Sequence, residues 1–198
     1  MKRLLLALPL LAACAGPDPS PNVMLETSLG EIEIEVYPER APVSAGDFLL
    51  HVDRGLYDGE GFYRVVRADN DPRGMGMSLI QGGLLSQEPV TPPIAHERTT
   101  DTGLSNVRGT VSIARDAPGT GSAAYFFINI GDNNFLDTGG ARNPDGEGYA
   151  SFGTVVRGME VVEAIQARDA SGDSPQPVTD DQYLTEPVLI TRAYRLGE

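Results

Sequence analysis

Few side chains in this sequence could carry covalent chemistry. Lys2 is the only lysine and Cys14 the only cysteine, which excludes a Schiff-base lysine, a P-loop lysine, an intrachain disulfide and a zinc–thiolate cluster from the folded part of the chain. The two histidines, His51 and His96, stand in no recognisable motif, and a serine hydrolase or a His-ligated metal site would have to use one of them. The sequence therefore points away from nucleophilic and metal-dependent catalysis.

The composition is that of a folded and strongly acidic protein. The chain has 198 residues, of which 40% are apolar and 22% charged, enough for one domain with a hydrophobic core. Its 28 acidic residues outnumber its 15 lysines and arginines and give a formal net charge of −13. Because binding to a phosphate backbone depends on positive charge, the composition argues against nucleic acid as a partner.

Residues 1–13 have the pattern of a secretory signal peptide. Lys2 and Arg3 precede the apolar run 4–11, which is too short to span a bilayer as a helix. The string Leu-Ala-Ala-Cys that ends at Cys14 resembles the bacterial lipobox, which implies cleavage before Cys14 and lipidation of its thiol. An ordinary signal peptide beside an incidental cysteine is the alternative.

The segment after the cleavage point has the composition of a tether. Residues 14–22 hold Cys14 and three prolines but no large apolar side chain, so we expect an extended linker between a lipid anchor and the domain. The lipobox resemblance implies a location on the periplasmic side of a bacterial envelope membrane, and Ala15 favours the outer membrane. We expect a lipid-anchored monomer.

Residues 23–198 are predicted to fold as one mainly β domain. Apolar and polar residues alternate in 31–36, after a first strand at 23–27, which predicts a half-buried hairpin. Helices are expected at 42–54 and 159–167, and the other strand-like runs are 62–66, 79–81, 110–114, 125–130, 150–156 and 187–195. Without a βαβ rhythm, these elements predict a closed eight-stranded antiparallel β-barrel capped by two α-helices.

Two long polar loops, 67–77 and 132–148, are rich in glycine and stand out between these elements. Loops of this length are uncommon in compact domains unless they line a site or move. The second loop carries oxygen ligands of the kind that calcium prefers, but it lacks the EF-hand spacing. A solvated loop is the main interpretation and a calcium site the alternative, with candidate ligands Asp132, Asp137, Asn143, Asp145 and Glu147.

A series of short strings in a defined order carries a family resemblance. The strings are Phe62-Tyr63-Arg64-Val65, Gln81-Gly82-Gly83, Arg108-Gly109-Thr110 leading to Ala114-Arg115, and Phe126-Phe127-Ile128-Asn129. Each would be weak alone, but their order, followed by the segment 156–162, resembles the cyclophilin-type peptidyl-prolyl cis/trans isomerases. The likeness runs from about residue 23 to residue 195.

This resemblance implies a reaction that suits the scarcity of reactive side chains. Rotation about an Xaa-Pro amide faces a barrier of about 18–20 kcal/mol because the C–N resonance must break. An arginine donor directed at the prolyl nitrogen, with an apolar pocket around the ring, weakens that resonance without a covalent intermediate, metal or cofactor. By motif position Arg64 is the catalytic guanidinium, and Gln81 orients it or holds the substrate carbonyl.

The resemblance also implies a substrate-binding set, for which ordinary barrel core is the alternative. Its members are Tyr63, Ser78, Leu79, Gln81, Ala114, Arg115, Tyr125, Phe127, Phe135, Leu136 and Tyr149. Of these, Leu79, Phe127 and Leu136 are expected to line the proline pocket. The backbone at 114–115 is expected to contact the substrate as an extended peptide contacts a sheet edge.

The sequence departs from the usual family pattern around this pocket. Ser78 replaces a Phe, which removes an aromatic wall, and Met75 or Met77 from the preceding loop is expected to refill the space. Tyr125 replaces a Gln, and Phe135 stands where cyclosporin-binding members commonly have a Trp. The expected function is an isomerase of proline bonds in exported or envelope proteins that assists their folding. The alternative is a catalytically weak peptide-binding module of the envelope.

Overall fold

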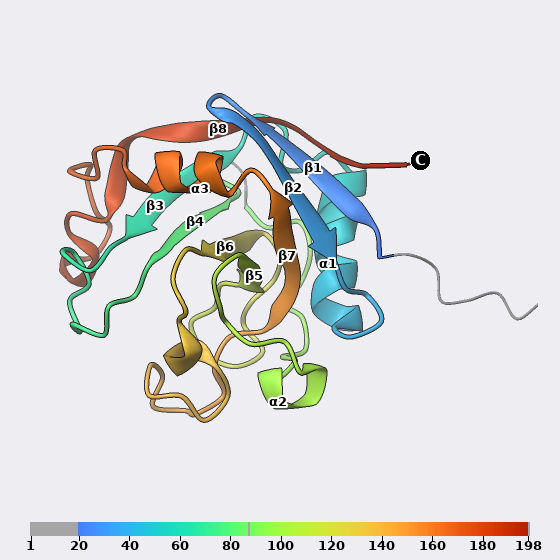
Figure 1. Ribbon diagram of the computed structural model, residues 1–198, viewed down its shortest axis with the longest axis horizontal. Helices are drawn as coiled ribbons and strands as arrows, with labels where there is room; N and C mark the ends of the chain where they lie inside the picture. The colour runs from blue at the N-terminus through green and yellow to red at the C-terminus, as the bar shows by residue number, and fades with distance from the viewer. Residues whose placement is uncertain (1–19, 87, 198) are drawn as a thin grey trace, which may run out of the picture.

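Eight strands close into an antiparallel barrel in the order β1-β2-β7-β5-β6-β4-β3-β8 (Figure 1). This computed structural model describes residues 20–86 and 88–197. The strands are β1 (Asn22–Thr27), β2 (Gly30–Val36), β3 (Gly61–Val66), β4 (Leu79–Gly83), β5 (Thr110–Ile113), β6 (Tyr125–Asn129), β7 (Ser151–Arg157) and β8 (Tyr183–Arg195). The barrel predicted from the sequence is confirmed.

The interior of the barrel is built from alternate residues of its strands. Ile32, Ile34 and Val36 of β2 are fully buried, whereas the glutamates between them point outward, as the alternation predicts. Phe62 and Phe126 pack edge to face inside, with ring centroids 5.8 Å apart. The opposite, outer face of the same strands is therefore available for a site.

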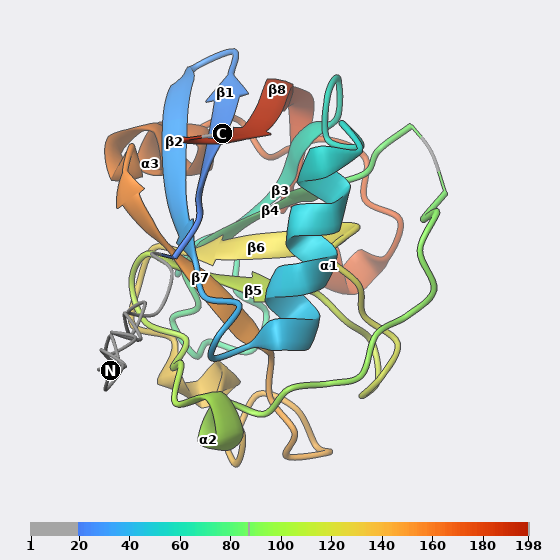
Figure 2. The same cartoon turned by 90° about the vertical axis from the view of Figure 1, so that its right-hand side faces the viewer.

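Among the described residues, two helices of at least eight residues pack on the barrel. Helix α1 (Pro42–Asp53) lies against β7 and β8, and α3 (Met159–Gln166) lies against β2, β3 and β4 (Figure 2). Pro42 opens α1, and the carboxylate of Glu97 accepts hydrogen bonds from the free backbone N–H groups of Val43 and Ser44 at 3.1 and 2.7 Å. Both predicted helices are present.

Three short helical segments were not predicted. They are α2 (Thr99–Thr102), η1 (Asn134–Leu136) and η2 (Pro177–Thr179). The last strand, β8, begins at Tyr183, four positions before the predicted start at Pro187. Its first part pairs irregularly with β3, because Arg64 lies opposite Tyr183 whereas Phe62 lies opposite Val188. Neither a short helical turn nor an irregular pairing leaves a periodic sequence signal.

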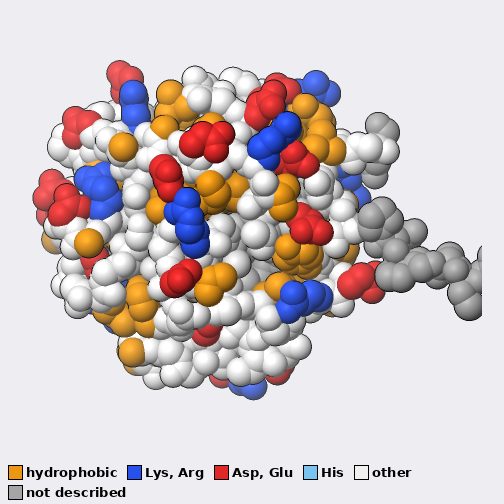
Figure 3. Space-filling view, in the orientation of Figure 1, with side chains coloured by type: hydrophobic (Ala, Val, Ile, Leu, Met, Phe, Trp, Pro, Cys, Tyr) orange, Lys and Arg blue, Asp and Glu red, His pale blue; other side chains and the backbone are white. Residues whose placement is uncertain are grey.

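The predicted signal peptide, Cys14 and most of the tether lie outside the described residues. Within residues 20–86 and 88–197, no helix is long and apolar enough to cross a bilayer. On the face seen in Figure 3, acidic and basic side chains are interspersed and do not gather into a patch of one sign.

Candidate active site

A pocket of about 750 Å³ lies on the outer face of β3, β4 and β6. Alternation along the strands explains its lining, because Leu79 and Gln81 of β4 face it while Ile80 between them is buried in the barrel core. In β6, Tyr125 and Phe127 face the pocket in the same way. The predicted site residues on these two strands are thus brought together.

A β-bulge brings two consecutive residues of β3 into the same pocket. The register between β3 and β4 shifts after Phe62, which lies opposite Gly82, so that Arg64 lies opposite Gln81. In a regular strand, neighbours point to opposite faces, whereas the extra residue of a bulge re-aims the side chains around it. Tyr63 and Arg64 consequently both line the pocket.

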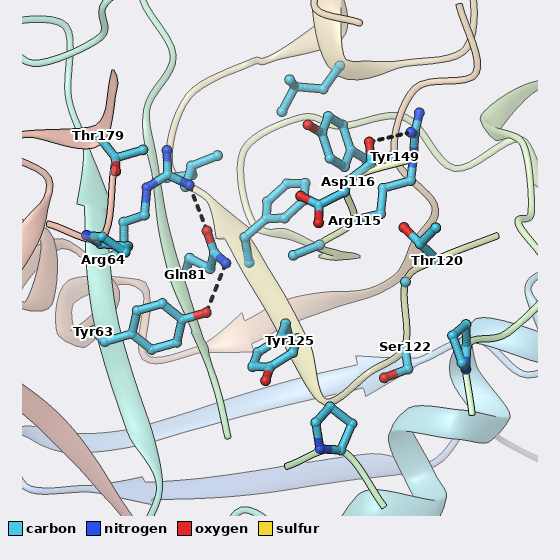
Figure 4. A pocket seen from close by; sticks show the side chains of 18 of the residues that line it. Tyr63, Arg64, Gln81, Arg115, Asp116, Thr120, Ser122, Tyr125, Tyr149 and Thr179 are labelled. Atoms are coloured by element: carbon cyan, nitrogen blue, oxygen red, sulfur yellow. Dashed lines mark hydrogen bonds between the residues drawn. The ribbon is translucent and has the colours of Figure 1, made fainter. Parts of the chain in front are cut away.

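Arg64 is held by two glutamine side chains, of which Figure 4 shows Gln81. Oε1 of Gln182 accepts from Nε at 2.9 Å and from Nη2 at 2.6 Å, and Oε1 of Gln81 accepts from Nη1 at 2.7 Å. A guanidinium has five N–H donors, and these bonds use three. One donor on Nη1 and one on Nη2 therefore remain for a substrate.

The partners of Arg64 leave its charge intact. Both acceptors are neutral amides, and no ion pair of Arg64 is found within the described residues. Burial lowers the pKa of Arg64, but an arginine remains protonated at any physiological pH. Burial also raises the pKa of the Tyr63 phenol, whose oxygen accepts from Nε2 of Gln81 at 2.9 Å. The site holds a full positive charge beside neutral acceptors.

The floor of the pocket is apolar. Val66, Met77, Leu79, Phe127 and Leu136 form a second buried cluster outside the barrel core. The ring of Tyr149 meets that of Phe127 edge to face at a centroid distance of 5.4 Å. Such a surface suits a compact apolar ring such as proline, because each buried CH₂ contributes about 0.8 kcal/mol.

Two of the predicted substrate-binding residues lie outside the lining. The hydroxyl of Ser78 accepts a hydrogen bond from Nε2 of Gln166 at 3.0 Å, and so faces helix α3. Phe135 packs beside the second apolar cluster without lining the pocket. Met77, which is 5% exposed, occupies the floor, as expected for a methionine that refills the space of the missing aromatic ring.

Arg115 braces the wall of the pocket opposite Arg64 (Figure 4). Its side chain is 1% exposed, pairs with Asp145 at 3.0 Å and donates to the carbonyl of Gly148 at 2.8 Å. Its guanidinium carbon lies 5.2 Å from the centre of the Tyr149 ring. The N–H of the neighbouring Ala114 already donates to the carbonyl of Tyr125. This wall is therefore internally bonded, with its charge neutralised.

Four parts of the site and its rim were not predicted from the sequence. Gln182, which is 1% exposed, precedes the last strand in a stretch without any motif. The rim segments 89–93 and 175–179 also line the pocket, together with Arg142 of the second long loop. Their side chains reach the site only because the fold brings distant loops together, so nothing in the local sequence identifies them.

The carboxylates of loop 132–148 are bonded to protein donors. Asp145 pairs with Arg115, Glu147 pairs with Arg98, and Asp137 accepts from the N–H of Asn106 at 2.7 Å. Within the described part of the chain, no group of three or more acidic, histidine or cysteine residues could hold a metal ion. The loop carboxylates hold the loop in place.

The comparisons with known sequences agree with this geometry. Residues 22–194 match the family model described as cyclophilin type peptidyl-prolyl cis-trans isomerase/CLD. The chain is 37% identical to peptidyl-prolyl cis-trans isomerase A of Dickeya dadantii, over 88% of this chain and 84% of that protein. It is 33% identical to peptidyl-prolyl cis-trans isomerase B of Escherichia coli, over 85% of this chain and 99% of that protein.

A solved structure shows the same fold. A cyclophilin type peptidyl-prolyl cis-trans isomerase of Cryptosporidium parvum superposes with a TM-score of 0.67 at 17% identity, over 90% of this chain and 99% of that one. A second structure of that protein was determined in the presence of the dipeptide Ala-Pro, and matches with a TM-score of 0.66.

Proposed function

The chain belongs to the cyclophilin-type peptidyl-prolyl cis-trans isomerase family and is itself such an isomerase; from this premise we propose that it acts on Xaa-Pro bonds of exported or envelope proteins, with Arg64 as the catalytic residue. The observation that carries the assignment to Arg64 is its pair of uncommitted N–H donors above an apolar floor. Proline-containing peptides are the partners of this site.

The proposed mechanism follows from what the site offers a prolyl amide. The ring lies on the apolar floor formed by Leu79, Phe127 and Leu136. Arg64 then donates to the prolyl nitrogen, whose lone pair becomes available only as the amide twists and its resonance breaks. This hydrogen bond is stronger in the twisted amide than in the planar one. It therefore stabilises the transition state more than the bound planar peptide, and the barrier to rotation falls.

The proposed location rests on the amino-terminal sequence. The basic residues, the apolar run and the lipobox-like string at Cys14 support a lipid anchor, and the proline-rich segment 14–22 supports a tether that holds the domain off the membrane. A thioether-linked diacyl group on Cys14 would place the isomerase among proteins that fold after export.

A weak peptide-binding module remains the second candidate function. The replacements at Ser78 and Tyr125 favour it, since both change the surroundings of the pocket relative to the usual family pattern. An intact Arg64 with two free donors favours catalysis, because binding alone does not require a charge directed at the amide nitrogen.

Mass spectrometry of the mature protein from bacterial membranes tests the location. We expect an N-terminal Cys14 carrying a diacylglycerol thioether, and release of the folded domain into the aqueous phase for Cys14→Ser. A mature protein that begins elsewhere, or an unmodified Cys14, would refute the anchor.

Isomerisation of a denatured exported protein by the same sample tests the client class, and a rate no faster than without the protein would favour the binding module.

A further inference from the structure

The two long loops, 67–77 and 132–148, which were predicted either to line a site or to move, meet beside the pocket. Nη1 of Arg73, in loop 67–77, donates to the carbonyl of Arg142, in loop 132–148, at 2.6 Å. The N–H of Arg142 donates to the carbonyl of Phe135 at 3.1 Å. The backbone of Arg142 is thus held from both sides, which fixes where its side chain begins.

The first loop is organised by one carboxylate. Asp71 accepts hydrogen bonds from the N–H groups of Arg73, Met75 and Met77 at 3.1, 2.8 and 3.2 Å. Burial alone would raise the pKa of Asp71, but these backbone donors and the charge of Arg142 bring its pKa below the ordinary value. The hydrogen bonds to Asp71 hold the loop in the conformation that places Met77 in the pocket floor and Arg73 within hydrogen-bonding distance of the carbonyl of Arg142.

The side chain of Arg142 lines the pocket and carries an unsatisfied donor. Its Nε is buried and has no hydrogen bond within the described residues, and no carboxylate of those residues forms an ion pair with it. A buried donor left without an acceptor is energetically unfavourable. A bound acceptor would remove that cost.

The pocket has a cationic side in an otherwise acidic protein. Four charged side chains line it, and they are Arg64, Arg115, Arg142 and Asp116. Arg115 is neutralised by Asp145, and Asp116 is exposed on the opposite wall from Arg64 (Figure 4). Arg64 and Arg142 therefore remain as the two cations of the lining that form no ion pair within the described residues, in a chain of net charge −13.

We infer that Arg142 is a specificity determinant that binds the carboxylate of an Asp or Glu next to the substrate proline. Arg142 lines the same pocket as Met77 and Leu136 of the apolar floor, so we expect a side chain beside the prolyl ring to come within its reach. Arg64 is already assigned to the amide, which leaves Arg142 for the flanking residue. The inference rests on the isomerase activity and is independent of where the protein resides.

Isomerisation rates for a set of short peptides test this inference. The peptides carry Glu, Gln or Lys immediately before or immediately after one proline, and NMR exchange measures kcat/KM without a coupling protease that has its own charge preference. We expect kcat/KM for Glu to exceed that for Gln by about tenfold in at least one of the two positions, as for a charge-assisted hydrogen bond. Raising the salt concentration should reduce this ratio.

Two variants assign the preference to one side chain. Arg142→Gln should bring the Glu/Gln ratio close to one, and Arg142→Glu should reverse the preference in favour of Lys. The matched control is Arg54→Gln, which makes the same change in net charge at an exposed position outside the pocket and should keep the wild-type ratio. A wild-type protein that isomerises Gln peptides but shows no acidic preference in either position would overturn the inference, as would an unchanged ratio in folded Arg142→Gln. Absence of isomerisation for every peptide would instead contradict the catalytic assignment.

Discussion

The amide oxygen of Gln182 lies 2.9 Å from Nε and 2.6 Å from Nη2 of Arg64, so a single neutral acceptor holds one whole edge of the guanidinium. Gln182 is itself fixed, because its Nε2 donates to the carbonyl of Asn70 at 2.8 Å and its carbonyl accepts from the N–H of Val65. Arg64 is oriented by residues that do not neutralise it. The guanidinium is therefore held in a fixed orientation and still presents its full positive charge to the substrate.

We expect Gln182→Ala to lower kcat for prolyl isomerisation by about tenfold with little change in KM, because loss of the acceptor lets the guanidinium leave its orientation. Gln182→Glu should retain both hydrogen bonds but lower kcat as well, since a carboxylate neutralises Arg64. The check is the split between kcat and KM in variants of unchanged circular dichroism. Full activity of Gln182→Glu would show that the charge of Arg64 is unimportant.

Met77 is expected to act on substrate binding. Met77→Ala opens the apolar floor beneath the proline ring, so KM should rise several-fold while kcat changes less. Ser78→Ala is the comparison, because its hydroxyl faces Gln166 outside the pocket. Steady-state kinetics on one Ala-Pro peptide shows which of the two residues contacts the proline ring. A larger increase in KM for Ser78→Ala than for Met77→Ala would mean that Ser78, and not Met77, forms that part of the proline pocket.

The pH profile of the wild-type enzyme should be flat between about pH 6 and pH 9, measured as kcat/KM on a peptide without ionisable side chains. Burial lowers the pKa of Arg64 from a value so high that the group stays protonated throughout this range. The pKa of Tyr63 is raised, mainly by burial, so the phenol stays neutral. A bell-shaped profile in this range would reveal a general acid or base that the proposed mechanism lacks.

The sequence predicted the barrel and both long helices because they depend on periodic patterns. Alternation of apolar and polar residues, as at Ile32, Ile34 and Val36, is found wherever one face of a strand is buried, whatever the fold. The position of Arg64 and Gln81 followed from ordered motifs. Gln182 and Arg142 could not be predicted, because their roles arise from contacts of loops far apart in the sequence. Ser78 illustrates a further limit, since the motif register could not tell which way its side chain would face.

The most direct test of catalysis by Arg64 is the isomerisation rate of Arg64→Ala, measured by NMR exchange on an Xaa-Pro peptide beside the wild-type protein. We predict a fall in kcat/KM of at least about tenfold, equivalent to about 1.4 kcal/mol of transition-state stabilisation, in a variant that keeps its fold. Arg64→Lys should also be impaired, because an ammonium cannot reproduce the planar set of donors that Gln81 and Gln182 orient. An unchanged kcat/KM in correctly folded Arg64→Ala would contradict the assignment of Arg64 as the catalytic residue.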